Sequence, residues 1–350
     1  MNQHGAAQGE QRGAQHGVAP VHGARFGALD LMQALQLGHA VAALHALGVM
    51  DALSAARLPE ELACQFGLDE ALLKGLLDHA ARATDLVSRR GRRYRRSRAW
   101  NGEARFLVGL YGLAFGATSA QVQTLLLHPA RGPALIDRQQ HALAFAGHDG
   151  VRAAASLGVL PGLLRQLGLK RVLDLGCGPA TLLIEMAASD PAFRGWGVEA
   201  NAGMQGAARA AMRQAGVARR VRLLRGDARA IDTVLPPAVA AEVKAVVASQ
   251  FVNEMFGAGT VAVVDWLRRL RQVLPGRLLV LADYCGRLGS PLPADGRLTL
   301  VHDHAQLLSG QGVPPARRHE WAALYRAAGG HLVHAMEDTQ STRFVHLVAL

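Results

Sequence analysis

Hydrophobic positions change their spacing part-way along the chain, and the change predicts two kinds of structure. From Leu29 to Val49, apolar residues recur every third or fourth position, which predicts an amphipathic helix. From Arg171 onward, short apolar runs alternate with helical patterns, as strands and helices do in an α/β fold. We therefore expect a mainly helical first half and an α/β second half.

The first half has the order of elements of a winged-helix domain. Two short helices are expected at 58–63 and 67–73, joined by a glycine turn, and a β-hairpin is expected around Gly91. Residues from about 100 to 150 are helical by pattern, and we expect them to bridge the two halves and to close over a ligand.

The second half is expected to form a mostly parallel sheet with one antiparallel strand, because its last two strands form a hairpin. The predicted strands are 171–175, 195–199, 220–225, 243–249, 277–283, 331–336 and 343–349. Helices are expected between the first five strands and at 320–325, whereas 285–315 has an irregular pattern. The predicted division is a disordered tail over 1–25, a winged-helix domain over 26–150 and an α/β domain over 151–350.

Composition narrows the class of protein. The formal charge of +11 comes largely from arginines crowded around the predicted hairpin, a pattern typical of a solvated surface, so nucleic acid is not an expected partner. No apolar run is long enough to span a membrane, and the first residues lack the order of a signal peptide, so we expect a cytoplasmic protein. Cys64, Cys177 and Cys285 lie far apart, which fits reduced thiols, and no metal site is expected.

A buried strand that runs into a glycine turn is the strongest functional signal. Asp174 ends this strand, and Gly176 and Gly178 permit the positive φ values and the close backbone approach that a nucleotide-shaped ligand requires. Glu199 ends the next strand, at the spacing from which an acidic side chain reaches ribose hydroxyls. A third glycine is absent, since Thr181 occupies its place, and this argues against a dinucleotide.

The next two strands also end in small or polar residues. Asp227 and Ala228 follow the third strand, and Ser249 and Gln250 close the fourth. Because open α/β sheets bind ligands at the carboxyl ends of their strands, these residues are expected at the same site as the glycine turn.

These motifs, in this order, resemble those of the class I S-adenosylmethionine-dependent methyltransferases. Over nearly its whole length the chain is similar to two-domain small-molecule O-methyltransferases with an N-terminal winged-helix dimerisation domain. The resemblance implies a Rossmann-like seven-stranded sheet, S-adenosylmethionine as cofactor with S-adenosylhomocysteine as product, and a homodimer. It also implies that Asp174, Gly176 and Gly178 hold the methionine part, that Glu199 binds the ribose, and that Asp227 and Ala228 lie at the adenine. Ser249 and Gln250 are then expected near the transferred methyl group.

The chain departs from this family where a catalytic base is expected. Plant-like members carry a His-Asp pair at the position of Asn253 and Glu254, and an asparagine cannot take a proton. Glu254 could serve as the base with a raised pKa, or the base could be His302 or His304, which share a side if their segment is extended. Alternatively, the acceptor could be acidic enough to need only positioning.

We expect methyl transfer to a small molecule, at oxygen, in secondary metabolism. One alternative is C-methylation of a 2-oxo acid, for which a related branch holds a metal with a histidine at the place of Asn253, and asparagine is a poor ligand. A second alternative is a DNA-binding regulator that senses S-adenosylmethionine through its winged helix. A third is a scaffold without activity.

Overall fold

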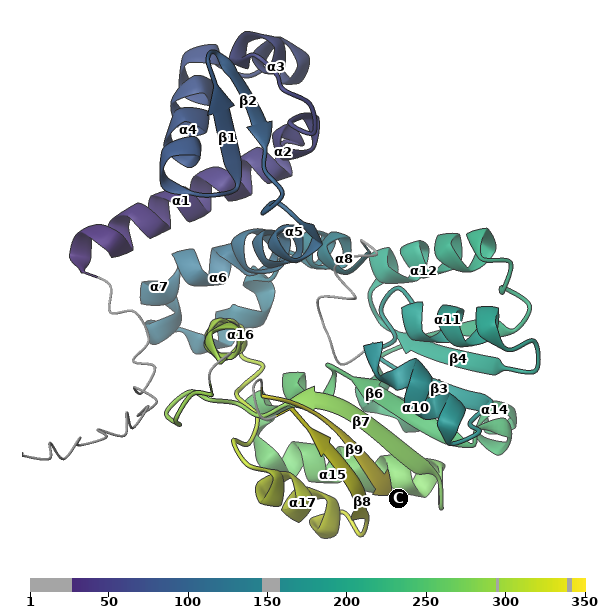
Figure 1. Cartoon of the computed structure of the whole chain (residues 1–350). Coiled ribbons are helices and arrows are strands. Elements are labelled where there is room, and N and C mark those ends of the chain that lie inside the picture. Colours follow the sequence, from purple (N-terminus) through teal and green to yellow (C-terminus); the bar gives the residue numbers. More distant parts are fainter. Residues whose placement is uncertain (1–26, 147–157, 294–295, 339–341) are drawn as a thin grey trace, which may run out of the picture.

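The computed structural model describes residues 27–146, 158–293, 296–338 and 342–350, so the predicted tail over 1–25 lies outside the described residues (Figure 1). The chain begins with a small helical unit and a two-stranded hairpin. Its elements are α1 (Ala28–Ala46), α2 (Val49–Ala52), α3 (Pro59–Phe66), α4 (Glu70–Ala83), β1 (Val87–Arg90) and β2 (Arg93–Arg96). The predicted first helix, the helix pair and the hairpin are confirmed.

Glycine turns and a side-chain cap define this unit. Gly67 and Gly91 both have positive φ, which allows the tight turns between α3 and α4 and between β1 and β2. Asp69 caps α4 by accepting a hydrogen bond of 2.7 Å from the amide of Leu72. Leu44, Leu77 and other apolar residues form a core of their own beneath the hairpin.

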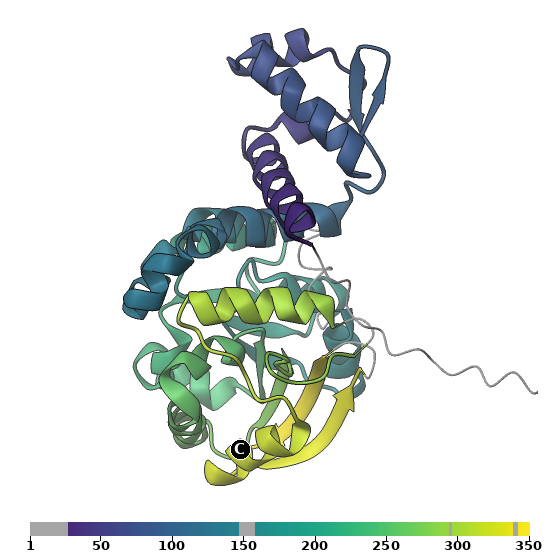
Figure 2. The same cartoon turned by 90° about the vertical axis from the view of Figure 1, so that its left-hand side faces the viewer.

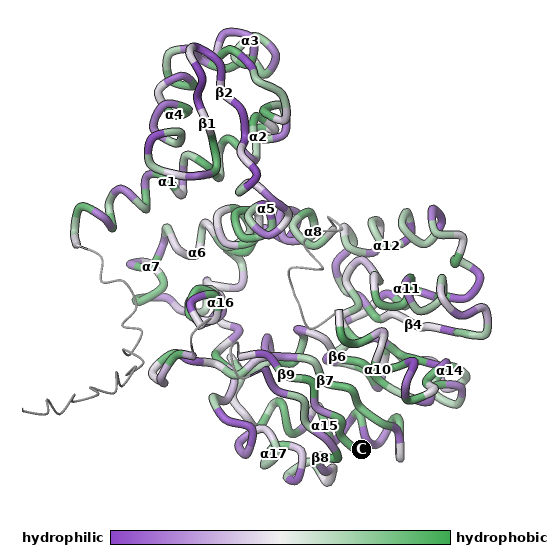
Figure 3. Tube along the Cα trace, in the orientation of Figure 1, coloured by the Kyte–Doolittle hydropathy of each residue, from purple (hydrophilic) through white to green (hydrophobic). Residues whose placement is uncertain are grey.

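The hairpin arginines are largely paired within the same unit. Arg89 lies 2.5 Å from Asp78, and Arg92 lies 2.7 Å from Glu60. Arg93 and Arg96 also form ion pairs, with Glu61 and Asp51. The hairpin is therefore a hydrophilic surface, as Figure 3 shows, whose charge is partly neutralised by neighbouring helices.

A row of short helices lies between this unit and the sheet (Figures 1 and 2). It comprises α5 (Gly102–Leu107), the π-helix η1 (Val108–Ala114), α6 (Gly116–Ala120), α7 (Val122–Leu127), the 3-10 helix η2 (Pro129–Leu135) and α8 (Arg138–Ala146). These elements confirm the predicted helical bridge as far as residue 146.

Seven strands form one sheet in the order β5-β4-β3-β6-β7-β9-β8. They are β3 (Arg171–Leu175), β4 (Arg194–Glu199), β5 (Val221–Arg225), β6 (Ala245–Ser249), β7 (Leu278–Tyr284), β8 (His331–Glu337) and β9 (Arg343–Ala349). All neighbours are parallel except that β9 runs antiparallel to both β7 and β8. The predicted sheet, with its single antiparallel strand, is confirmed.

Helices cover both faces of the sheet. Successive side chains of a strand point to opposite faces, and apolar side chains lie on both of them. On one face lie α10 (Leu160–Gln166), α11 (Thr181–Ser189) and α12 (Ala202–Gln214), packed on residues such as Val172 and Val247. On the other lie α13 (Ile231–Val234), α14 (Pro237–Glu242), α15 (Gly259–Val273) and α17 (Arg318–Ala327), packed on residues such as Leu173 and Val246. No helix in the described part of the chain is long and apolar enough to cross a membrane.

The prediction of an irregular segment over 285–315 was wrong for its central part, which forms the helix α16 (Arg297–Leu308). The buried face of α16 is largely polar and includes Asp303 and Gln306, whereas Val301 and Leu307 are exposed. Asp303 accepts hydrogen bonds from the hydroxyl of Tyr284 and from two backbone amides. Polar contacts hold this helix in place, so its apolar residues are not gathered on the buried face. For this reason the spacing of hydrophobic residues did not predict the helix.

Candidate active site

The glycine turn after β3 forms a tight cradle. Gly176 and Gly178 have φ values of 68° and 53°, and Ala180, which caps α11, also has a positive φ of 59°. A Cβ atom at Gly176 would lie 2.8 Å from the ring of Phe251, so only glycine fits there. The turn leaves the amino end of α11 facing the same space as the carboxyl end of β3.

Glu199 fastens this turn to the next strand. Its Oε2 accepts a hydrogen bond of 2.9 Å from the amide of Gly178, and its Oε1 accepts one of 2.6 Å from the amide of Asn201. Burial raises the pKa of the carboxyl group, and the backbone hydrogen bonds oppose that rise. A carboxylate has lone pairs for further donors, so Glu199 can brace the turn and still bind a diol.

Asp174 is buried at the bottom of the cradle, with 4% of its surface exposed. Burial, followed by the nearby Glu199, raises the pKa of Asp174 to about 8. Its carboxyl group is therefore largely protonated near neutral pH, and an approaching cation favours its ionised form.

The other predicted cofactor residues lie at the ends of β5 and β6. Asp227 is half exposed and accepts a hydrogen bond of 2.9 Å from the amide of Arg229, while the carbonyl of Ala228 accepts one from Trp266. Ser249 has a buried hydroxyl with no hydrogen-bond partner among the described residues, and Gln250 has a positive φ of 50°. A buried hydroxyl of this kind is costly unless a ligand satisfies it.

All these residues line one cavity of about 400 Å³. The cavity walls include Asp174, Gly176, Gly178, Glu199, Asp227, Ala228, Ser249 and Gln250. Three of the predicted acceptor-side residues, Asn253, Glu254 and His302, line the same cavity. His304 does not, because it lies on another side of α16 and borders a second hollow beside Tyr111. The cradle and the predicted acceptor side are thus brought together, except at His304.

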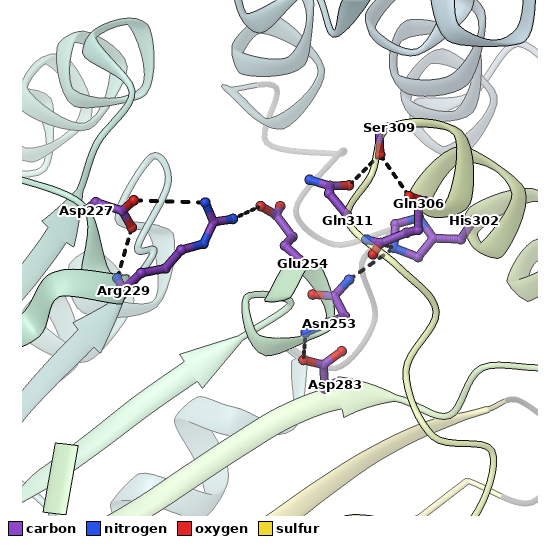
Figure 4. A network of polar contacts seen from close by, with 9 residues as sticks. All are labelled: Asp227, Arg229, Asn253, Glu254, Asp283, His302, Gln306, Ser309 and Gln311. Carbon is purple, nitrogen blue, oxygen red and sulfur yellow. Dashed lines mark hydrogen bonds and ion pairs between the residues drawn. The ribbon is translucent and has the colours of Figure 1, made fainter. Parts of the chain in front are cut away.

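Asn253 and His302 belong to a hydrogen-bonded cluster with Gln306 (Figure 4). The Gln306 amide satisfies its neighbours when its nitrogen donates to the carbonyls of Gly312 and Asn253, both at 3.0 Å. Its oxygen then accepts from Nδ2 of Asn253 at 2.9 Å and from Nε2 of His302 at 3.2 Å. His302 consequently carries its hydrogen on Nε2, and its Nδ1 accepts from the hydroxyl of Tyr111 at 3.0 Å.

The environment of this cluster keeps His302 neutral and leaves one Asn253 atom unsatisfied. Burial, followed by His141 and Arg343, lowers the pKa of His302 to about 4. Asn253 is 2% exposed, and its Oδ1 is buried with no hydrogen-bond partner among the described residues. In Figure 4 this oxygen lies on the side of the amide away from His302.

Glu254 points in another direction, toward the cofactor cradle. Its carboxylate lies 3.5 Å from the guanidinium of Arg229, which in turn lies 3.9 Å from Asp227 (Figure 4). Burial raises the pKa of Glu254, while Arg229 and Arg138 act in the opposite direction. Glu254 is thus a carboxyl group that lies beside charged side chains, in line with Arg229 and Asp227.

Two glycines allow the loop after α16 to press against the segment that carries Asn253. The amide of Gly257 donates a hydrogen bond of 2.6 Å to the carbonyl of Gln311. A Cβ atom at Gly257 would overlap the carbonyl of Gly310, and one at Gly312 would lie 2.4 Å from the backbone of Gly257. This close approach holds His302 and Gln306 against Asn253.

The sequence predicted that the helical bridge closes over a ligand, but not which of its residues line the cavity. The wall that the bridge contributes comprises Leu110, Phe115, Arg138, His141 and Phe145, with Gln306 and Gln311 from the opposite side. The rings of Phe115, His141 and Phe145 are in contact, with centroids 6.1 Å and 5.0 Å apart. These residues have an ordinary helical pattern, and only the packing of α8 on α12 and η1 brings them to the cavity.

Comparisons with known proteins agree with this arrangement. Residues 172–274 match the sequence profile of a methyltransferase domain family. No curated protein matches the sequence of the chain.

Solved structures match over most of the chain at low sequence identity, which shows a shared fold. The mitomycin 7-O-methyltransferase MmcR has a TM-score of 0.71 at 18% identity, over 92% of this chain and 96% of that one. PigF, solved with SAH, has a TM-score of 0.73 at 17% identity, over 92% and 98%. An N,N-8-amino-8-demethyl-D-riboflavin dimethyltransferase, RosA from Streptomyces davawensis, has a TM-score of 0.58 at 21% identity, over 93% and 99%.

Proposed function

We propose that this chain, an S-adenosylmethionine-dependent methyltransferase whose residues 172–274 match a methyltransferase domain family, methylates a hydroxyl group of a small molecule. The observation that carries the proposal is the single cavity that joins the cradle of Asp174 and Glu199 to a second region lined by Asn253 and His302. Transfer to oxygen is the reaction named for MmcR, whose fold this chain shares.

The chemistry of the cradle fits the cofactor. Glu199 would accept hydrogen bonds from the two ribose hydroxyls, and Asp227 with Ala228 would meet the adenine. Asp174 and the backbone at Gly176 and Gly178 would hold the methionine part, where the ammonium group favours the ionised form of Asp174. The partnerless hydroxyl of Ser249, next to Gln250, would gain a partner near the sulfur.

Catalysis in this site is mainly a matter of geometry. S-adenosylmethionine supplies a methyl group that its sulfonium already activates. The chain has to align an acceptor oxygen behind that methyl group and exclude water, and effective molarities from such alignment reach ~10⁵–10⁸ M. The apolar wall of Leu110, Phe115 and Phe145 suits a flat, largely apolar acceptor.

On the acceptor side, Asn253 would position the acceptor. Its buried Oδ1 can accept a hydrogen bond from the acceptor hydroxyl but cannot take the proton. His302 would hold Asn253 in place through Gln306. Glu254 remains a candidate for the proton acceptor, whereas His304 would have to act from the second hollow.

We further propose that two chains associate through the N-terminal part, assigned as a winged-helix domain over 26–150 that precedes the catalytic domain over 151–350. Large apolar side chains on α1 and α7 support this, because Leu29 is 80% exposed and Leu126 is 79% exposed. A cytoplasmic location stays a prediction from the sequence.

The direct test of the function is transfer of labelled methyl groups. The full chain is incubated with methyl-labelled S-adenosylmethionine and a panel of small phenols, and S-adenosylhomocysteine and labelled products are measured by mass spectrometry. We expect a labelled methyl ether and an equal amount of S-adenosylhomocysteine. Cofactor binding without transfer, together with duplex DNA binding that weakens steeply with salt, would favour the regulator instead.

A further inference from the structure

A hydroxyl acceptor must lose a proton, and the proposed function leaves open which side chain receives it. His302 lines the cavity, but both of its ring nitrogens are engaged. Nδ1 accepts a hydrogen bond from Tyr111, and Nε2 donates one to Gln306. For His302 to take up a proton from an acceptor at Nδ1, the hydroxyl of Tyr111 would have to give up its place at this nitrogen.

Glu254 is also poorly placed for this role. Its carboxylate is paired with Arg229, and Asp227 lies on the other side of the same guanidinium. Protonation of Glu254 would leave the charge of Arg229 without this partner. The carboxylate therefore serves better as a counter-charge than as a base.

A second histidine lines the cavity from the opposite wall. His141 lies on α8, with its ring between those of Phe115 and Phe145. Its ring nitrogens have no hydrogen-bond partner among the described residues, while its backbone amide donates a hydrogen bond of 2.9 Å to the carbonyl of Asp137. Among the cavity-lining imidazoles of the described chain, His141 thus offers a nitrogen that is free to meet an acceptor.

The position of His141 relative to the cofactor cradle is fixed by contacts at the start and in the middle of α8. The side chain of Asn201, whose backbone amide is bound by Glu199, donates a hydrogen bond of 3.3 Å to the carbonyl of Arg138. One turn further along α8, Ala142 lies close to α12. A Cβ atom added at Gly203 on α12 would be 3.3 Å from the Cβ atom of Ala142. The same acidic residue that would bind the ribose therefore helps to orient the helix that carries His141.

The charges around His141 favour an unprotonated ring. Burial, followed by Arg138 on the same helix, lowers the pKa of His141 to about 4. His302 on α16 interacts electrostatically with His141, and its pKa is also lowered to about 4. Glu254 interacts with Arg229 and Arg138, which favour its ionised form. At neutral pH the ring carries a lone pair that is available to a proton.

We propose that His141 is the catalytic base of the methyl transfer, acting on an acceptor hydroxyl that Asn253 positions. This rests on the proposed function. The acceptor oxygen forms a bond to the methyl carbon, the carbon–sulfur bond breaks with its electron pair staying on sulfur, and the hydroxyl proton passes to the free nitrogen of His141. The imidazolium then releases the proton to water when the product leaves.

Turnover with acceptors of different acidity tests this assignment. The phenol that gives the fastest release of S-adenosylhomocysteine is compared with its more acidic nitro-substituted analogue, in the wild-type chain and in His141→Gln. We expect the variant to lose about 100-fold or more in kcat for the parent phenol. The loss should be much smaller for the nitrophenol, because that acceptor is already ionised.

Controls separate a base from a structural role. His128→Gln, at an exposed histidine outside the cavity, should retain full activity, and His141→Gln should bind S-adenosylhomocysteine with wild-type affinity in calorimetry. If His141→Gln binds the cofactor weakly, His141→Asn replaces it in the comparison. An equal loss for both acceptors, or full activity in His141→Gln with loss in Glu254→Gln, would overturn the proposal. Absence of any transfer in the wild type would overturn the proposed function itself.

Discussion

At the scale of single residues, burial sets the acidity of Asp174 and Glu199. Both carboxyl groups have raised pKa values because the sheet and its helices remove them from water. Their ionised forms are costly in the chain alone. In the proposed complex, the ammonium group of the cofactor would favour the ionised form of Asp174.

Asp174 should couple stability to pH. Its folded pKa of about 8 lies above the ordinary value of 3.8, so the folded chain binds more protons than the unfolded chain between these limits. Its contribution to the free energy of unfolding is complete below the ordinary value and is lost as pH rises through about 8. We expect Asp174→Asn to remove this loss and to weaken cofactor binding. Urea unfolding at about pH 6 and about pH 9 measures the first effect, and calorimetry the second. If the free energy of unfolding of Asp174→Asn depended on pH as that of the wild type does, this role of Asp174 would be contradicted.

Glu199 gives a second prediction at the residue scale. Glu199→Ala should weaken S-adenosylmethionine binding by about 1–3 kcal/mol, because hydrogen bonds from the ribose and from Gly178 lose their charged acceptor. Glu242→Ala is the matched control, since this exposed glutamate pairs with Arg171 at the opposite end of β3. Equal affinities of the two variants in calorimetry would count against the ribose assignment.

At the scale of elements, the loop between α16 and α17 matters because it holds one wall of the cavity. Gly257→Ala would drive a Cβ atom into the carbonyl of Gly310, so the loop must move away from Asn253. We expect kcat to fall by as much as ~100-fold with cofactor affinity retained, since small misplacements of acceptor-side groups are costly. Gly206→Ala on α12, where the added Cβ atom meets no neighbour, is the control. Wild-type turnover in Gly257→Ala would show that this loop does not position the acceptor.

Most elements were predictable from spacing, and the exception has a physical cause. The strands β3, β6 and β9 were located from their apolar runs because both faces of a parallel sheet are buried. Helix α16 was not, since Asp303 and Gln306 face inward and form hydrogen bonds there. When polar residues of a helix face inward, the spacing of its hydrophobic residues no longer indicates which face is buried.

The gathering of Gly176, Glu199 and Asp227 in one cavity was likewise predictable, whereas the opposite wall was not. Strand ends and glycine turns are local features, so the sequence places these three residues at the carboxyl ends of neighbouring strands. His141 and Phe115 reach the cavity only because separate helices pack together. His302 and His304 were expected to share a side, but a helix turns them toward different hollows.

At the scale of the whole molecule, the exposed apolar side chains of α1 and α7 predict a dimer. A Leu31→Glu/Leu35→Glu variant places two charges one turn apart on α1, where these leucines are 50% and 53% exposed. We expect light scattering to give the mass of two chains for the wild type and of one for the variant. Leu72→Glu, at another exposed leucine, should leave the mass unchanged. A wild-type mass of one chain at micromolar concentration would contradict the proposed dimer.

The central claim is that one cavity binds S-adenosylmethionine and presents its methyl group to a small hydroxyl acceptor. Incubation with methyl-labelled cofactor and the phenol panel measures this most directly, with wild type and Glu199→Ala compared at a cofactor concentration near the wild-type dissociation constant. The account predicts a labelled methyl ether matched by S-adenosylhomocysteine, and a much slower reaction in the variant. Bound cofactor whose label never reaches any acceptor, or transfer that Glu199→Ala leaves unchanged, would contradict it.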